Sequence, residues 1–195
     1  HQEARRQRQM CIRDRISKPS SASWMKSNIS SFSDTTDLHH MRQALTLARR
    51  NLGCTASNPS VGCIIVKNGQ IIGRGVTAPG GRPHAETRAL EQAGKETHGA
   101  TLYVTLEPCC HHGKTPPCSE SIIAAGITRV VIACEDPHPE MRGRSIQQLR
   151  EAGIDVTTGI GEAEAQDINA GFFSVQQRDM PLVGLKIATS LDGKL

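Results

Sequence analysis

The chain has 195 residues, a formal net charge of +4, and 37% hydrophobic but only 3% aromatic residues. This length allows one domain of ordinary size plus a tail or the start of a second, and the few aromatic residues favour an α/β core of Ile, Val, Leu and Ala. The small charge gives no indication of nucleic acid as a partner, and no apolar run reaches the roughly 18 residues of a membrane-spanning helix. We therefore expect neither a nucleic-acid nor a membrane partner.

The cysteines are odd in number and lack the regular framework of a small secreted protein. This usage predicts a soluble protein in a reducing, cytoplasmic setting. The seven positions are Cys11, Cys54, Cys63, Cys109, Cys110, Cys118 and Cys134.

Residues 1–36 differ in composition from the rest of the chain. They begin with the charged stretch HQEARRQRQMCIRDR and continue as a Ser-rich segment with almost no apolar periodicity. We expect a disordered or non-native leader here, and Met25 is a plausible true start. A basic, transit-like leader is the alternative.

The next elements are a helix and a hairpin. Apolar residues at helical spacing predict a helix over 37–53, with Asp37 as N-cap and Gly53 as stop. Two apolar runs within 61–76 flank Asn68-Gly69, the strongest short signal for a β-hairpin. A further helix is expected over 84–95.

Strands and helices then alternate up to residue 160. This alternation predicts parallel strands joined by right-handed crossovers, with the hairpin as an antiparallel edge. The expected fold is therefore α/β, with three α/β/α layers around a mixed, mostly parallel sheet. The pattern predicts strands at 100–106, 128–134 and 154–160, helices at 119–126, 143–153 and 162–177, and a new strand from 182.

The stretch PCCHHGKTPPC, residues 108–118, holds three of the seven cysteines. Catalytic zinc sites use three protein ligands and leave one position open, and His84, Cys109 and Cys118 offer such a set where helices begin and strands end. Glu86, two residues after His84, is placed to face the same metal without binding it. The alternative is a structural zinc closed by Cys110 or His111, or inert buried side chains.

His84-Ala85-Glu86 together with PCCHHGKTPPC resembles the deaminase domain of the bifunctional riboflavin-biosynthesis deaminase/reductase, in the cytidine-deaminase-like superfamily. The segments NPSVG at 58–62 and Asp136-Pro137 are also similar to that family. The resemblance implies a zinc hydrolase with one Zn²⁺ per chain. Its small-molecule substrate is a pyrimidine nucleotide, 2,5-diamino-6-ribosylamino-4(3H)-pyrimidinone 5′-phosphate, and Glu86 is its catalytic base and acid.

The same resemblance implies that Asn58, His111 and Lys114 bind the substrate. The alternatives are an Asn-Pro turn without function at Asn58 and a solvated loop lysine at Lys114. Two positions depart from the family pattern: Thr77 stands where relatives often have His, and His138 replaces an Asn. Both could alter contacts with the substrate.

The resemblance also implies a division of the chain into a zinc deaminase domain at 37–160, a connecting helix at 161–180 and the truncated start of a reductase domain at 181–195. Ala188 would contact NADP, but we expect NADPH to bind only the full-length protein. Members of the family are usually oligomeric, so a homo-oligomer is possible.

Two other functions fit parts of the pattern. A cytidine or tRNA-adenosine deaminase shares the His-Ala-Glu motif, but it normally has two residues between its cysteines where this chain has eight. A non-catalytic, zinc-stabilised module that pairs with a partner or with a reductase domain is the third hypothesis, and unfolding on chelation with no activity on any aminopyrimidine would favour it.

Overall fold

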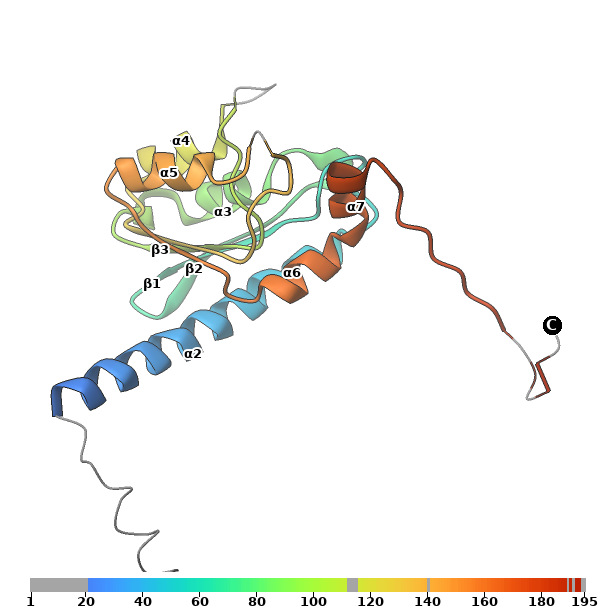
Figure 1. Cartoon of the computed structure of the whole chain (residues 1–195). Helices are drawn as coiled ribbons and strands as arrows, with labels where there is room; N and C mark the ends of the chain where they lie inside the picture. Colours follow the sequence, from blue (N-terminus) through green and yellow to red (C-terminus); the bar gives the residue numbers. More distant parts are fainter. Residues whose placement is uncertain (1–20, 112–115, 140, 189, 191, 194–195) are drawn as a thin grey trace, which may run out of the picture. The chain divides into compact units, whose positions relative to one another are not determined.

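The computed structural model describes residues 21–111, 116–139, 141–188, 190 and 192–193, with side chains described from residue 35 onward. The chain divides into two units, His1–Thr36 and Asp37–Leu195. The second unit contains the sheet and the helices around it (Figure 1).

One five-stranded sheet forms the centre of the second unit, in the order β2-β1-β3-β4-β5. Strand β1 pairs antiparallel with both β2 and β3, whereas β3, β4 and β5 are parallel to one another. The predicted parallel core and antiparallel edge hairpin are confirmed. The strands are β1 (Gly62–Lys67), β2 (Gln70–Val76), β3 (Thr101–Val104), β4 (Arg129–Ile132) and β5 (Asp155–Thr158).

Helices cover both faces of this sheet. Figure 1 shows α3, α4 and α5 on one face, and α6 with the part of α2 that follows residue 36 on the other. The predicted three-layer α/β/α fold is confirmed. The helices are α2 (Ser21–Arg50), α3 (Ala85–Ala93), α4 (Cys118–Ala124), α5 (Arg144–Glu151), α6 (Glu162–Ile168) and α7 (Ala170–Arg178), with short 3₁₀ turns η1 (Pro79–Gly81) and η2 (Gly94–Thr97).

The hairpin turn forms where the sequence predicts it. Asn68 and Gly69 both have positive φ, 51° and 75°, as a two-residue type I′ turn requires. Because this turn matches the twist of its flanking strands, it fixes the register of β1 on β2.

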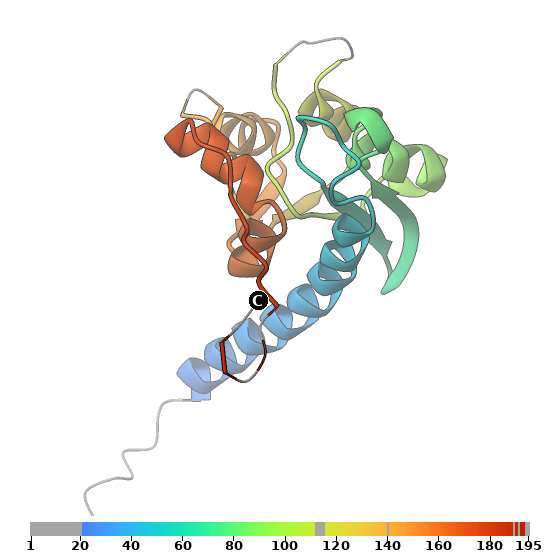
Figure 2. The same cartoon turned by 90° about the vertical axis from the view of Figure 1, so that its right-hand side faces the viewer.

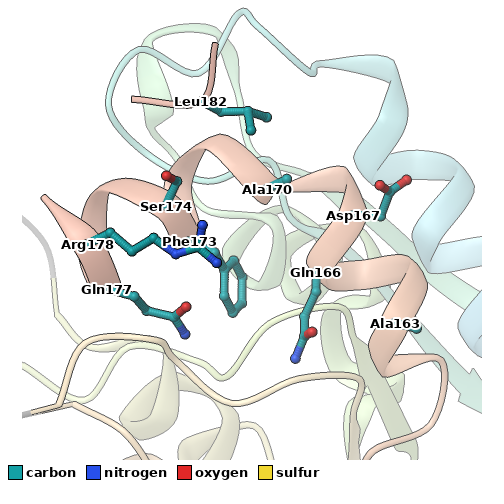
Figure 3. A pocket seen from close by; sticks show the side chains of 9 residues that line it. All are labelled: Ala163, Gln166, Asp167, Ala170, Phe173, Ser174, Gln177, Arg178 and Leu182. Carbon is teal, nitrogen blue, oxygen red and sulfur yellow. The ribbon is translucent and has the colours of Figure 1, made fainter. Parts of the chain in front are cut away.

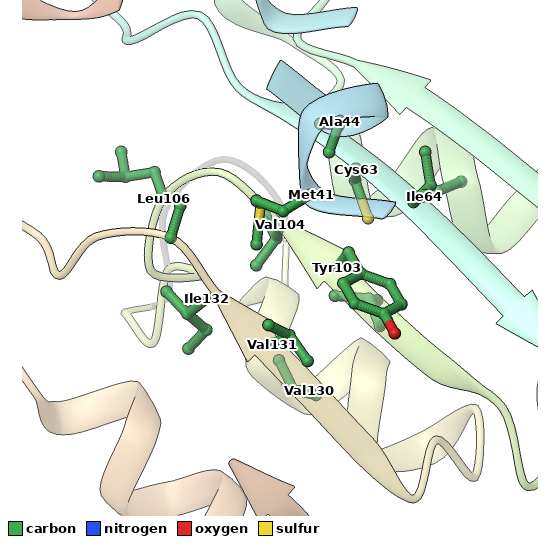
Figure 4. Close-up of a cluster of buried hydrophobic side chains, with 14 of the residues drawn as sticks. Met41, Ala44, Cys63, Ile64, Tyr103, Val104, Leu106, Val130, Val131 and Ile132 are labelled. Carbon is green, nitrogen blue, oxygen red and sulfur yellow. The ribbon is translucent and has the colours of Figure 1, made fainter. Parts of the chain in front are cut away.

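The hydrophobic core lies between the sheet and the helices and consists mainly of aliphatic side chains. Figure 4 shows Met41 and Ala44 of α2 against side chains of β1, β3 and β4. Fully buried Val and Ile side chains follow one another in β4, as expected for a strand covered on both faces. The low aromatic content is therefore compatible with a continuous core.

Helix α3 lies unusually close to β2, and glycine makes this possible. A Cβ atom at Gly75 would lie 1.9 Å from the carbonyl oxygen of Ala85, closer than any real contact allows. The first turn of α3, which carries Glu86, therefore rests directly on the end of β2.

A cluster of polar groups joins α2 to the sheet. The guanidinium group of Arg129 donates two hydrogen bonds to the carboxylate of Asp37, at 2.7 and 2.8 Å, and the hydroxyl of Tyr103 donates a third at 2.9 Å. Burial opposes the charge on Asp37, but these hydrogen bonds and the nearby positive charge outweigh it and lower its pKa below 3.8. Asp37 is therefore a fully partnered buried anion.

Three predictions about the elements are wrong. Helix α2 begins at Ser21, not at Asp37, so residues 21–36 are helical where we expected a disordered leader. No Gly or Pro lies between residues 21 and 50, so nothing in that segment stops the helix from extending towards the N-terminus. Residues 1–20 of the predicted leader lie outside the described residues.

The C-terminal part of the chain also differs from the predicted elements. The single connecting helix expected over 161–180 is two helices, α6 and α7, which meet at Asn169. The strand expected from residue 182 is absent over the described residues up to 188, which have no sheet partner and are exposed. Across the described part of the chain, none of the helices combines the length and apolarity needed to cross a bilayer.

Candidate metal centre

Three potential metal ligands come from three separate elements. His84 is the N-cap residue of α3, Cys109 lies in the loop after β3, and Cys118 is the first residue of α4. The backbone N–H of Cys118 donates to the Cys109 sulfur at 3.3 Å, and the N–H of Ser119 donates to the Cys109 carbonyl at 3.1 Å. The start of α4 thus fixes the position of Cys109.

The geometry of these donors fits a zinc ion. Nδ1 of His84 lies 3.6 Å from the sulfur of Cys109 and 3.4 Å from that of Cys118. Usual Zn–N and Zn–S bond lengths at a tetrahedral angle place N and S about 3.6 Å apart. All three ligand atoms lie within 4.8 Å of one another, and among the described residues no fourth ligand joins this group. Within the described part of the loop, neither Cys110 nor His111 belongs to the group, and three protein donors are the number that a catalytic zinc site uses.

The three donor side chains shift one another's pKa values. Hydrogen bonds from the Cys118 side chain and from His84 lower the pKa of Cys109 to about 4, although burial opposes this shift. The pKa of Cys118 is raised, because its thiol bonds to Cys109 and is buried. The hydrogen bond with Cys109 raises the pKa of His84. A divalent cation would favour both thiolates and neutral imidazole, which are the forms that bind metals.

Glu86 lies beside this group and is 4% exposed. Burial raises its pKa to about 7, an effect that the charge of His84 and a hydrogen bond with Cys118 only partly offset. A cation held by the neighbouring donors would stabilise the carboxylate and lower this pKa.

A cavity of about 160 Å³ opens onto these residues. Figure 2 shows the loop between β3 and α4 running between α7 and the loops that precede α3. Residues from all three segments line the cavity together with Glu86 of α3 and Asp136, which follows β4. They are Asn58, Pro59, Val61, Thr77, His84, Glu86, Leu106, Glu107, Cys109, His111, Asp136 and Phe172.

Two of the residues predicted to bind the substrate line the cavity. Asn58 is half-buried and His111 is exposed, and both line the cavity with His84 and Glu86. Lys114 lies outside the described residues. Ala188 lies in the extended segment after α7 and is exposed, so its predicted contact with NADP stays a prediction.

Thr77 and His138, the two residues that depart from the family pattern, form different hydrogen bonds. The hydroxyl of Thr77 accepts a hydrogen bond of 2.9 Å from the backbone N–H of Val61, so this buried group links the two strands of the hairpin. His138 follows the cavity-lining Asp136, whose carboxylate accepts a hydrogen bond of 2.8 Å from the His138 N–H. Thr77 therefore lines the cavity with its hydroxyl already engaged.

A second buried glutamate, Glu107, holds one side of the cavity in place. Its carboxylate accepts hydrogen bonds from the N–H groups of Asp136, Gly143 and Ser145 and from the Ser145 hydroxyl, at 2.9 to 3.1 Å. This carboxylate satisfies the first N–H groups at the start of α5. Glu107 therefore fixes the loop on this side of the cavity.

Sequence reasoning missed the contribution of α7. Phe172 lines the cavity from this helix, which we had expected only to connect two domains. No motif surrounds Phe172, and its place depends on a tertiary contact: the buried side chain of Asn169 accepts a hydrogen bond from the Ser60 N–H at 2.8 Å and donates one to the Ser60 carbonyl at 3.0 Å.

The fold and the His/Cys/Cys donor set define a deaminase with a zinc-binding region. Residues 34–134 match the family model described as the cytidine and deoxycytidylate deaminase zinc-binding region, and the chain belongs to this family. Among individual proteins, the riboflavin biosynthesis protein RibD of Aquifex aeolicus is 50% identical over 159 residues, covering 82% of this chain and 45% of the relative. The chain thus spans less than half the length of this curated relative.

Solved structures give the same result. RibD of Acinetobacter baumannii matches with a TM-score of 0.79 and 50% identity, covering 83% of this chain and 46% of that one. A diaminohydroxyphosphoribosylaminopyrimidine deaminase/5-amino-6-(5-phosphoribosylamino)uracil reductase from Thermotoga maritima matches with a TM-score of 0.79 and 43% identity, covering 83% and 47%. These matches confirm the resemblance to the riboflavin-biosynthesis deaminases and the expected fold.

Proposed function

We propose that this chain catalyses the hydrolytic deamination of diaminohydroxyphosphoribosylaminopyrimidine, a step of riboflavin biosynthesis, with one zinc ion bound by His84, Cys109 and Cys118. One observation carries the proposal: a single small cavity is lined by two of the three clustered metal donors, His84 and Cys109, and by a buried glutamate whose pKa is raised to about 7. The Thermotoga maritima relative is named as a deaminase of this same compound, which supports the choice of substrate.

Zinc, when bound, supplies a Lewis acid that lowers the pKa of a water molecule towards neutrality. Glu86 takes one proton from the attacking water and gives it to the ring nitrogen, then takes the second proton from the hydroxyl group of the adduct and gives it to the amine. The C–O bond forms at the carbon that carries the amine, and the C–N bond breaks to release ammonia. One carboxylate serves as base and acid because its pKa can lie near the working pH.

The remaining cavity residues would orient the substrate. Asn58 can hydrogen-bond the edge of the pyrimidine through its amide, and the exposed His111 stands at the wall where the ribose phosphate would leave the cavity. Lys114, four residues before Cys118, would pair with the phosphate. We assign NADPH binding, and the contact of Ala188 with it, to the reductase half of the longer relatives.

The proposal is tested by two measurements on the same preparation. We expect about one zinc per chain and ammonia release from the diaminopyrimidine nucleotide, with little or none from cytidine or from tRNA. Ammonia release from cytidine alone would favour the general cytidine deaminase instead. Bound zinc without release from any of the three would favour a non-catalytic module.

A further inference from the structure

The size of the cavity limits what part of a nucleotide can enter it. Its volume of about 160 Å³ is well below the roughly 300–1,000 Å³ of pockets that enclose whole drug-sized ligands. The cavity can therefore hold the ring, while the sugar and phosphate extend out of it. Any ring placed next to Cys109 and Glu86 shares this small space with the other lining side chains.

Among the described residues that line this cavity, Phe172 is the only Phe, Tyr or Trp. Together with Asn58 and Pro59, it also lines a neighbouring groove of about 350 Å³ between the loop at 52–60 and α7. The ring therefore lies between the two spaces and gives the cavity an apolar, aromatic side.

The position of this wall is fixed by Asn169. This residue begins the turn from α6 to α7, is 4% exposed, and holds both backbone groups of Ser60, close to Asn58 and Pro59 of the cavity. The hydroxyl of Ser60 in turn donates a hydrogen bond of 2.6 Å to the Ala48 carbonyl in α2. Phe172 therefore stands on a helix that is tied to the opposite cavity wall.

We propose, resting on the function proposed above, that Phe172 determines specificity by stacking against the planar aminopyrimidine ring, and that Asn169 is the residue that positions it. A flat heterocycle gains from an aromatic wall about as much as a base gains from stacking in other proteins, and a non-planar or larger ring would collide with it.

The test measures equilibrium binding of the diaminopyrimidine nucleotide to the zinc-loaded chain by calorimetry, in a Glu86→Gln background that prevents turnover. We expect Phe172→Ala to weaken binding by roughly 5- to 150-fold, the range that corresponds to losing one stacked base. Phe172→Tyr should bind within about threefold of the parent, because its ring is retained. Zinc content should be the same in all variants.

Phe173, the next residue on α7, lines a separate groove, where Figure 3 shows it with Gln166 and Ser174. Its ring lies edge-on to that of Phe172, with the ring centroids 6.2 Å apart, so Phe173 supports Phe172 and is left unchanged in the test. The control is Gln177, an exposed residue of α7 that does not line the cavity. Gln177→Ala should leave nucleotide binding unchanged, and equal binding by Phe172→Ala and Gln177→Ala would overturn the proposal.

Asn169 is tested through a double-mutant cycle. Asn169→Ala should weaken binding in the parent but have no additional effect when Phe172 is already Ala, because it acts through that ring. Additive losses would overturn its positioning role. Absence of binding to every variant would overturn both the inference and the proposed substrate, whereas binding that depends on Phe172 in a chain without ammonia release would overturn only the proposed reaction.

Discussion

Asp37 and Glu86 are both buried carboxylates of the same unit, but their surroundings are opposite. Asp37 accepts hydrogen bonds from Arg129 and Tyr103, and its pKa is lowered. Glu86 faces two cysteines and a histidine, and burial raises its pKa to about 7. A carboxylate with full partners holds elements together, whereas one kept near its pKa is suited to exchange protons. The two regions should therefore fail in different ways when they are altered.

The largest effect is expected at the metal donors. Cys118→Ala removes one of three ligands, so zinc affinity should fall by more than the roughly 10- to 100-fold that is usual for losing an outer partner of a metal ligand. Zinc content and ammonia release should be lost together, as measured by metal analysis and a coupled ammonia assay. Cys54→Ala, at an exposed cysteine, is the control and should retain both. Full zinc occupancy in Cys118→Ala would refute the donor set.

Glu86→Gln should slow the reaction without changing the fold or the metal site. It removes the proton acceptor but keeps the size of the side chain, so kcat should fall by about 10²- to 10⁴-fold while zinc content and melting temperature stay close to the parent. Glu91→Gln, at an exposed position of the same helix, should leave all three unchanged. Turnover near the parent rate in Glu86→Gln would remove Glu86 from the mechanism.

Asp37→Ala should produce the opposite pattern. Removing Asp37 deprives Arg129 and Tyr103 of their buried acceptor and leaves Arg129 with the exposed carboxylate of Asp155 at 3.3 Å, so the free energy of unfolding should fall by about 3 kcal/mol. Urea unfolding measures this loss, and the fully zinc-loaded variant should keep its kcat while folded. As a comparison, Glu135→Ala breaks an exposed pair with Arg142 and should not shift the urea midpoint measurably. A midpoint unchanged in Asp37→Ala would show that the pair does not hold α2 on the sheet.

The smallest effect is a pH dependence that belongs to Asp37. Because its pKa in the folded state is lowered below 3.8, its contribution to stability is present above about pH 4 and is lost as the pH falls through the folded-state pKa. Urea midpoints of the parent at pH 6 and pH 3 should therefore differ more than those of Asp37→Asn, which cannot titrate at this position. An equal drop in both proteins would assign the acid sensitivity to other groups.

Local periodicity predicted most of the fold. The hairpin at Asn68-Gly69, the helix that carries Glu86 and the parallel order of the last three strands all follow from residue spacing and turn chemistry within short segments. The metal donors were found because His, Cys and Glu are chemically distinctive and lie at element ends. Their convergence follows from the topology of a parallel sheet.

The structural features that the sequence did not predict depend on contacts between distant segments. The break between α6 and α7 is associated with the bonds of Asn169 to the backbone of Ser60, more than 100 positions earlier in the chain. The early start of α2 follows from the absence of a helix breaker, which a pattern of apolar residues does not reveal. The strand expected after Pro181 has suitable residues, but a strand also needs a neighbour.

The close approach at Gly75 has a consequence for how such a site can diverge. The donors come from α3, from the loop after β3 and from α4, and α3 rests on β2 without room for one methyl group. A side chain at Gly75 would push α3, and His84 and Glu86 with it, away from β2, whereas Phe172 belongs to α7. Substitutions on α7 can therefore change one side of the cavity without moving these two residues.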